Sequence, residues 1–138
     1  MENHDHLAQI LHAGERKGDV FSDQCPSREV LNHVTSRWGV LVLMALLNGE
    51  KQRFSQLRKR ILRISEKMLA QTLQALEKDG FVLRTVYPVV PPHVEYELTA
   101  AGFEVANRVQ VLASWLEDNI GDIVASQQEY EKQRTSSH

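Results

Sequence analysis

Lys67, Gln71 and Gln74 recur at intervals of four and three residues, in a segment whose apolar residues follow the same helical period. On one α-helix these three side chains share the face opposite the apolar stripe, which is the face that meets solvent. A glutamine amide can form two hydrogen bonds with an adenine edge. If this helix enters a major groove, these residues are the candidates to read base edges.

Basic and hydroxyl side chains near this helix are suited to phosphate contacts, which position a protein on DNA without reading its sequence. Ser65 stands where the helix N-cap is expected, and the free amides of a helix N-terminus also favour an anion. Tyr87 and His93 lie near the tip of an expected hairpin, from which they could reach the minor groove or the backbone. The predicted backbone contacts are Arg53, Arg58, Arg63, Ser65, Arg84, Tyr87 and His93.

Basic residues are concentrated in the middle of the chain, although the net charge of the 138 residues is −2. Residues 51–84 contain nine Lys and Arg against three Asp and Glu, whereas the remainder contains seven against fifteen. A solvated helix face is the usual meaning of four or five such residues. Here the concentration is higher and coincides with the candidate base-reading helix, which indicates an electropositive surface suited to nucleic acid.

Apolar periodicity predicts the elements that must hold these residues. The segment 38–47 is apolar nearly all round and should lie at the centre of the fold. Gly80 should end the candidate base-reading helix, and Thr99 should cap the last one. Helices are expected over residues 7–11, 26–34, 38–47, 54–61, 66–79 and 100–125, with Met68, Leu69, Thr72, Leu73 and Leu76 facing inward in the fifth.

After Gly80 the period changes from helical to alternating, which predicts a β-hairpin with a stiff, proline-rich loop. The polar tail after Glu129 is expected to fray. The residues expected to face one side of the hairpin are Phe81, Leu83, Thr85 and Tyr87 on the first strand and Val94, Tyr96 and Leu98 on the second.

Helix, short turn, helix and hairpin is the order of a winged helix-turn-helix. We therefore expect a mainly α fold with a small β-hairpin, in one domain over residues 1–138 with a core at about 25–100. The last helix carries more apolar surface than such a domain can cover, so we expect a dimerisation helix at about 100–125. Its predicted interface residues are Val109, Leu112, Leu116 and Ile120.

Several blocks of sequence, in order, resemble the HxlR-type bacterial regulators over residues 25–115. The resemblance implies a winged-helix homodimer that binds a roughly palindromic operator and represses or activates transcription. It also implies that both terminal helices form the dimer interface, the N-terminal one at about 5–16 contributing Leu7, Ile10 and Leu11. Ser36, Arg37 and Trp38 stand where relatives commonly have Gly-Lys-Trp, which preserves the basic charge. The matching blocks are CP at 25–26, RW at 37–38, RFSQL at 53–57, ISEKML at 64–69, LEKDG at 76–80, VYP at 86–88, VPPHVEY at 90–96 and LT at 98–99.

Cys25 is the only cysteine, so no disulfide can form within one chain, and the composition fits a reducing compartment. It precedes Pro26 at a helix start, where backbone amides and the helix dipole favour the thiolate. In some regulators of the type that this chain resembles, a cysteine at this place senses oxidants, quinones or aldehydes. The alternative is a small buried residue with an inert thiol, in a regulator that responds to a small molecule instead.

Other classes of function are less favoured by the residues. His4, His6 and His12 could be imagined to hold a metal with Cys25, but no Cys-x-x-Cys or helical His pair supports such a site, so no metal and no cofactor are expected. No catalytic motif appears, so we expect that the protein is not an enzyme.

A winged-helix module that docks on an acidic protein remains an alternative to DNA binding. No apolar run approaches the length of a membrane span and the start does not resemble an export signal, so a cytoplasmic location is expected.

Overall fold

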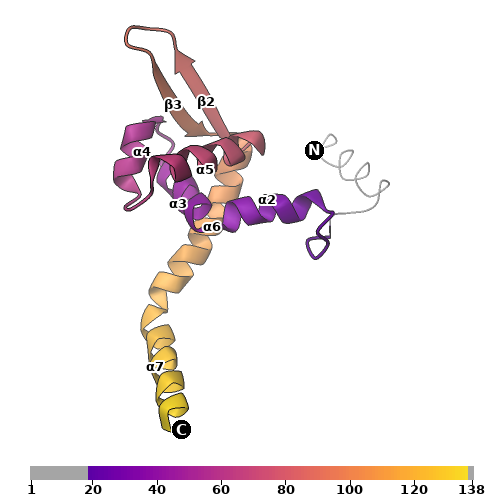
Figure 1. Cartoon of the computed structure of the whole chain (residues 1–138), viewed down its shortest axis with the longest axis vertical. Helices are drawn as coiled ribbons and strands as arrows, with labels where there is room; N and C mark the ends of the chain where they lie inside the picture. Colours follow the sequence, from indigo (N-terminus) through magenta and orange to yellow (C-terminus); the bar gives the residue numbers. More distant parts are fainter. Residues whose placement is uncertain (1–18, 137–138) are drawn as a thin grey trace.

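The computed structural model describes residues 19–136, and the predicted helix over residues 7–11 lies outside them (Figure 1). Within the described part there are six helices and a three-stranded sheet, which confirms the predicted winged-helix fold. The elements are α2 Pro26–Thr35, α3 Arg37–Leu46, β1 Gln52–Arg53, α4 Phe54–Arg60, α5 Glu66–Lys78, β2 Val82–Tyr87, β3 His93–Leu98, α6 Ala100–Asp118 and α7 Ile120–Ser136.

Hydroxyl side chains cap the N-termini of three of these helices. Ser36, Ser65 and Thr99 each accept a hydrogen bond of 3.0 Å from the backbone amide three residues later, at the starts of α3, α5 and α6. Each bond satisfies an amide that has no partner within its helix. The predicted caps at Ser65 and Thr99 are therefore confirmed.

Leucine-rich faces of α3, α4 and α5 form the core. Leu43 and Leu46 of α3 are completely buried, as are Leu57 of α4 and Leu69 of α5, which confirms the central position predicted for residues 38–47. The expectation that Met68 faces inward is wrong, because Met68 lies at the edge of the apolar stripe of α5 and is exposed.

The sheet has the order β1-β3-β2 and is antiparallel throughout. Val82 pairs with Leu98 and Tyr87 with His93, so Val82, Arg84 and Val86 lie on the same face as Leu98. At the α5 end of this face Val82 is buried in the core, whereas Arg84 and Val86 farther along are exposed. The prediction that Phe81, Leu83, Thr85 and Tyr87 share a side with the second strand's Val94, Tyr96 and Leu98 is wrong. The register pairs those three residues with Val86, Arg84 and Val82 instead, and Phe81 lies in the turn that leaves α5. Strand β1 was not predicted, since two residues are too few to show alternation.

The predicted C-terminal helix is in fact two helices. Asn119 ends α6, and its side-chain amide donates to the Trp115 carbonyl at 2.8 Å. Helix α7 continues to Ser136, so the prediction that the chain frays after Glu129 is wrong; helix-forming residues with contacts such as Gln133 to Glu129 extend it. Helix α6 begins beside the sheet and packs against α3, with Gly102 and Ala106 buried, and α7 then extends away from the other elements (Figure 1). None of the helices over residues 19–136 is long and apolar enough to span a membrane.

Candidate nucleic-acid interface

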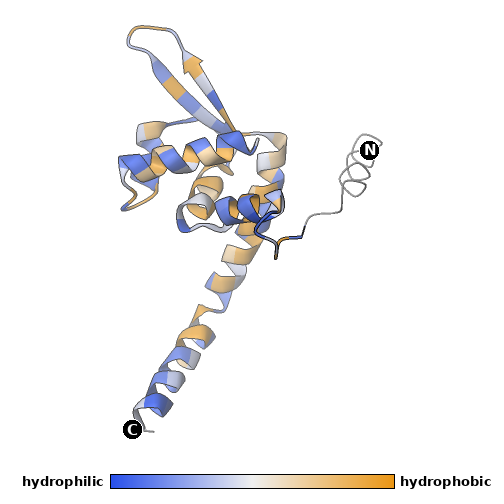
Figure 2. Cartoon of the chain, turned by 45° about the vertical axis from the view of Figure 1, so that its right-hand side comes forward, coloured by the Kyte–Doolittle hydropathy of each residue, from blue (hydrophilic) through white to orange (hydrophobic). Residues whose placement is uncertain are grey.

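Helix α5 presents a polar face opposite its buried leucines. Lys67, Gln71 and Gln74 are all exposed, as the sequence predicted for the candidate base readers. Lys78 is also exposed and continues the same spacing, although it was not among the predicted site residues. Figure 2 shows this alternation of hydrophilic and hydrophobic residues along α5. The exposed stripe is about 16 Å long, since Lys78 lies eleven helical steps after Lys67 and each step adds about 1.5 Å.

A basic hollow lies at the N-terminal end of this stripe, between α4 and α5. Its volume is about 540 Å³. It brings together three of the predicted backbone contacts, Arg58, Arg63 and Ser65, and adds Lys59. Lys59 lies one turn after Ser55 on α4, a helical spacing that could have identified it. The hollow is lined by Ser55, Arg58, Lys59, Arg63, Ile64 and Ser65.

Two arginines of the hollow are held by local structure. The Arg58 guanidinium donates to the Ile64 carbonyl at 3.4 Å and lies 3.8 Å from the Glu66 carboxylate. Glu66 therefore competes with any phosphate for Arg58. Arg63 adopts φ = 74°, in the left-handed region, which turns the chain sharply between α4 and α5. That turn sets the angle at which α5 leaves the hollow.

The other predicted backbone contacts lie on the sheet, apart from the hollow. Arg53 precedes α4 and pairs in register with Glu95 of β3. Arg84 is exposed and lies opposite Tyr96, on the face of the sheet that meets the helices. The predicted backbone contacts therefore form two groups, one at the start of α5 and one on the sheet.

Tyr87 and His93 stack across the hairpin, with ring centroids 4.7 Å apart. The Lys51 ammonium donates to the Tyr87 hydroxyl at 3.4 Å, and this bond raises the pKa of Lys51. The imidazole of His93 lies 3.3 Å from the Glu95 carboxylate. Tyr87 and His93 are half-buried at the base of the loop, whereas Val90 at the tip is 98% exposed.

Cys25 is the N-cap residue of α2 and is half-buried. Its sulfur accepts a hydrogen bond from the Asp19 amide at 3.1 Å. The pKa of Cys25 is lowered, first by the side-chain hydrogen bond from Ser27 and then by backbone amides. Within residues 19–136 no group of three His, Cys, Asp or Glu side chains could hold a metal, and His4, His6 and His12 lie outside that range.

The predicted dimer residues of α6 and α7 divide into two kinds. Leu112, Leu116 and Ile120 are 58%, 43% and 53% exposed, and Trp115 beside them is 57% exposed. Val109 is partly buried against the core of its own chain. Leu7, Ile10 and Leu11 lie outside the described residues.

A family model and a curated relative both identify helix-turn-helix regulators as similar to this chain. The HxlR-like helix-turn-helix family matches residues 33–123. The uncharacterised HTH-type transcriptional regulator YtfH of Escherichia coli (strain K12) is 59% identical over 114 residues, covering 83% of this chain and 90% of the relative.

Two solved structures extend this similarity to the fold. The structure of ytfH from Salmonella typhimurium is 58% identical with a TM-score of 0.77, covering 81% of this chain and 99% of that one. The redox regulator HypR in its oxidised form is 36% identical with a TM-score of 0.62, and the match covers 69% of this chain and 97% of that one. The chain therefore belongs to the HxlR-like helix-turn-helix family of transcriptional regulators.

Proposed function

We propose that this regulator binds duplex DNA in the cytoplasm and places α5 in the major groove. The observation that carries the proposal is the exposed stripe of Lys67, Gln71, Gln74 and Lys78, which begins beside the basic hollow. Amide and ammonium groups on the stripe suit base edges. The hollow suits a phosphate, because Arg58, Lys59 and Arg63 line it together with two hydroxyls. Base reading and backbone contact would then occur from adjoining surfaces.

The sheet would supply a second set of contacts to the backbone. Arg84 extends from the face that meets the helices, so it would reach the phosphates nearest α5. Tyr87 and His93 would act at the base of the wing, where their stacking holds the two strands together, while the exposed loop beyond them approaches the minor groove. Arg53 would contact the backbone from the other end of α4.

A homodimer would place two copies of α5 on one duplex. The exposed apolar side chains of Leu112, Trp115, Leu116 and Ile120 follow one another along the C-terminal helices, a surface that a second copy can cover. A two-fold axis would set the two α5 helices about 34 Å apart, in successive major grooves. The operator is then expected to be an inverted repeat.

Selection of bound genomic fragments, followed by competition against random duplex, tests this proposal. Gln71→Ala should reduce discrimination at one base position by about 1–3 kcal/mol if its contact is bidentate, and Gln74→Ala should act at a neighbouring position. Gln128→Ala is a matched control, because Gln128 is an exposed glutamine of α7 far along the chain from α5.

Equal losses of affinity for the selected and the random duplex in Gln71→Ala would show that Gln71 does not read a base. Binding that no duplex sequence competes for would instead favour the acidic-protein docking module.

A redox response through Cys25 is a second proposal, supported by its lowered pKa and by the similarity to HypR, a redox regulator. Since the chain has one cysteine, a disulfide would join two chains. Diamide would take two protons and two electrons from the two thiols and become the hydrazine. DNA affinity of the wild type should then change with diamide, while that of Cys25→Ser should not. An identical response of both proteins would leave Cys25 inert and favour a small-molecule inducer.

A further inference from the structure

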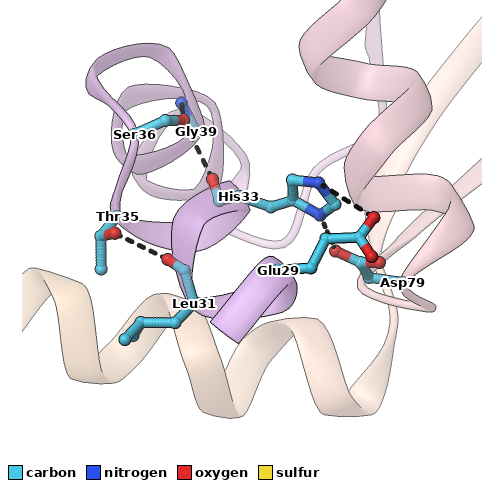
Figure 3. A network of polar contacts seen from close by, with 7 residues as sticks. All are labelled: Glu29, Leu31, His33, Thr35, Ser36, Gly39 and Asp79. Carbon is cyan, nitrogen blue, oxygen red and sulfur yellow. Dashed lines mark hydrogen bonds and ion pairs between the residues drawn. The ribbon is translucent and has the colours of Figure 1, made fainter. Parts of the chain in front are cut away.

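Helices α2 and α5 meet at their C-terminal ends through one short polar contact. His33 lies in the last turn of α2, and its Nδ1 is 2.5 Å from Oδ2 of Asp79, which is 46 residues away and caps α5 (Figure 3). The other ring nitrogen of His33 lies 4.0 Å from the Glu29 carboxylate, one turn earlier in α2. One imidazole therefore lies between carboxylates of two different helices.

The Asp79 carboxylate needs this contact. It lies at the C-terminus of α5, where the helix dipole is negative and disfavours an acid. The Asp79 side chain is also only 9% exposed, so water can solvate little of it. His33 supplies a donor at the place where α5 needs one. Lys78 lines the same region but belongs to α5 itself and cannot connect it to another helix.

The backbone of His33 is held as firmly as its side chain. The His33 carbonyl accepts a hydrogen bond of 3.0 Å from the Ser36 hydroxyl, whose oxygen in turn accepts from the Gly39 amide (Figure 3). These bonds fix His33 against the start of α3. By contrast, α2 has no buried residue, and Val34 is its one side chain among the partly buried hydrophobics that pack against the core. The polar contact is therefore a main determinant of where α2 and α5 meet.

The candidate base readers lie in the same place. A groove of about 370 Å³ between α2 and α5 is lined by Glu29 and His33 from α2 and by Gln71, Gln74, Ala75 and Lys78 from α5. The position of α2 therefore sets the space around both glutamines. A change in the angle between the helices would move Gln71 and Gln74 together relative to a duplex.

We propose that His33 is a positioning residue for sequence recognition, which acts through Asp79 to hold the C-terminal half of α5. This inference rests on the proposed function, because it assumes that α5 reads bases. Loss of the contact should impair discrimination between sequences more than it impairs binding to DNA in general, since phosphate contacts at the hollow lie at the opposite end of α5.

The test compares His33→Leu with His33→Asn in the full-length protein. Leucine removes the donor, whereas the asparagine amide places a donor close to the position of Nδ1. The affinity ratio between the selected duplex and a random duplex should fall about tenfold in His33→Leu, within the range that one bidentate base contact supplies. It should largely recover in His33→Asn. Asn32→Leu is the matched control, because Asn32 is the exposed neighbour of His33 on α2 and should leave the ratio unchanged.

Amide hydrogen exchange at residues 74–79 separates this inference from the proposed function. In His33→Leu these amides should exchange faster than in the wild type, while the core of α3 stays protected. A folded His33→Leu protein with the wild-type affinity ratio would overturn the inference, and so would failure of His33→Asn to restore the ratio. If the wild type itself prefers no sequence, the proposed function fails, and unchanged exchange at residues 74–79 would then overturn the positioning role separately.

Discussion

The carbonyl oxygen of His33 occupies the space into which a β-carbon on Gly39 would project. Helices α2 and α3 can meet at this corner only because residue 39 has no side chain. Gly39→Ala should therefore lower the free energy of unfolding by about 1–3 kcal/mol, since a backbone atom has to move to make room. Urea denaturation measures this change.

Gly121→Ala is the control for that substitution. No atom lies within 4 Å of a β-carbon built on Gly121, which is in the first turn of α7. Alanine there should leave stability unchanged or raise it by up to about 1 kcal/mol through helix propensity. Equal midpoints for the two variants would mean that the corner between α2 and α3 relaxes without cost.

Arg63 combines a left-handed backbone with a place in the basic hollow, so substitutions can separate its two roles. Arg63→Gly should relieve about 1–2 kcal/mol of backbone strain. About half of that gain is offset by about 0.5–1 kcal/mol of added chain entropy in the unfolded state. The free energy of unfolding should therefore rise by about 0.5–1 kcal/mol, while the slope of log affinity against log salt should flatten by about 1 if one phosphate contact is lost. Arg63→Lys keeps both the charge and the strain and should bind as the wild type does. A wild-type salt slope in Arg63→Gly would place Arg63 outside the interface.

Ser27 is expected to control the reactivity of Cys25. Its hydrogen bond is the largest cause of the lowered pKa of Cys25, so more thiolate is present at neutral pH than in an ordinary thiol. Ser27→Ala should raise the pKa and move the rise of the alkylation rate to higher pH. The rate of reaction with iodoacetamide, measured from pH 6 to 10, follows the thiolate directly. Superimposable curves for wild type and Ser27→Ala would contradict this cause.

Leu116 should be essential to a dimer formed by the C-terminal helices. Leu116→Asp would place a charge in an apolar interface, at a cost of several kcal/mol, and weaken association at least about 100-fold. Sedimentation at micromolar concentration should then show a monomer. Val90→Asp introduces the same charge at the exposed wing tip and should leave the dimer intact. Dimeric Leu116→Asp protein would place the interface elsewhere.

Local patterns were most informative where one element determines the outcome. The exposed positions of Lys67, Gln71 and Gln74 follow from helical period alone, because the buried leucines of α5 fix its inward face. The caps at Ser65 and Thr99 likewise depend on bonds within one turn of chain. By contrast, the inward face of β2 could not be inferred reliably, since apolar residues occur at both sets of alternate positions, Val82 and Val86 in one and Leu83 in the other.

The sequence by itself determined the winged-helix order, the basic segment and the side chains that α5 presents, because each follows from periodicity, charge and capping within short stretches. Only the tertiary structure decided which distant residues meet: β1 with β3, the hollow shared by α4 and α5, and the contact of His33 with Asp79. The physical reason is that such contacts depend on the angles between elements. Those angles are set by the packing of the whole core rather than by the residues that come together.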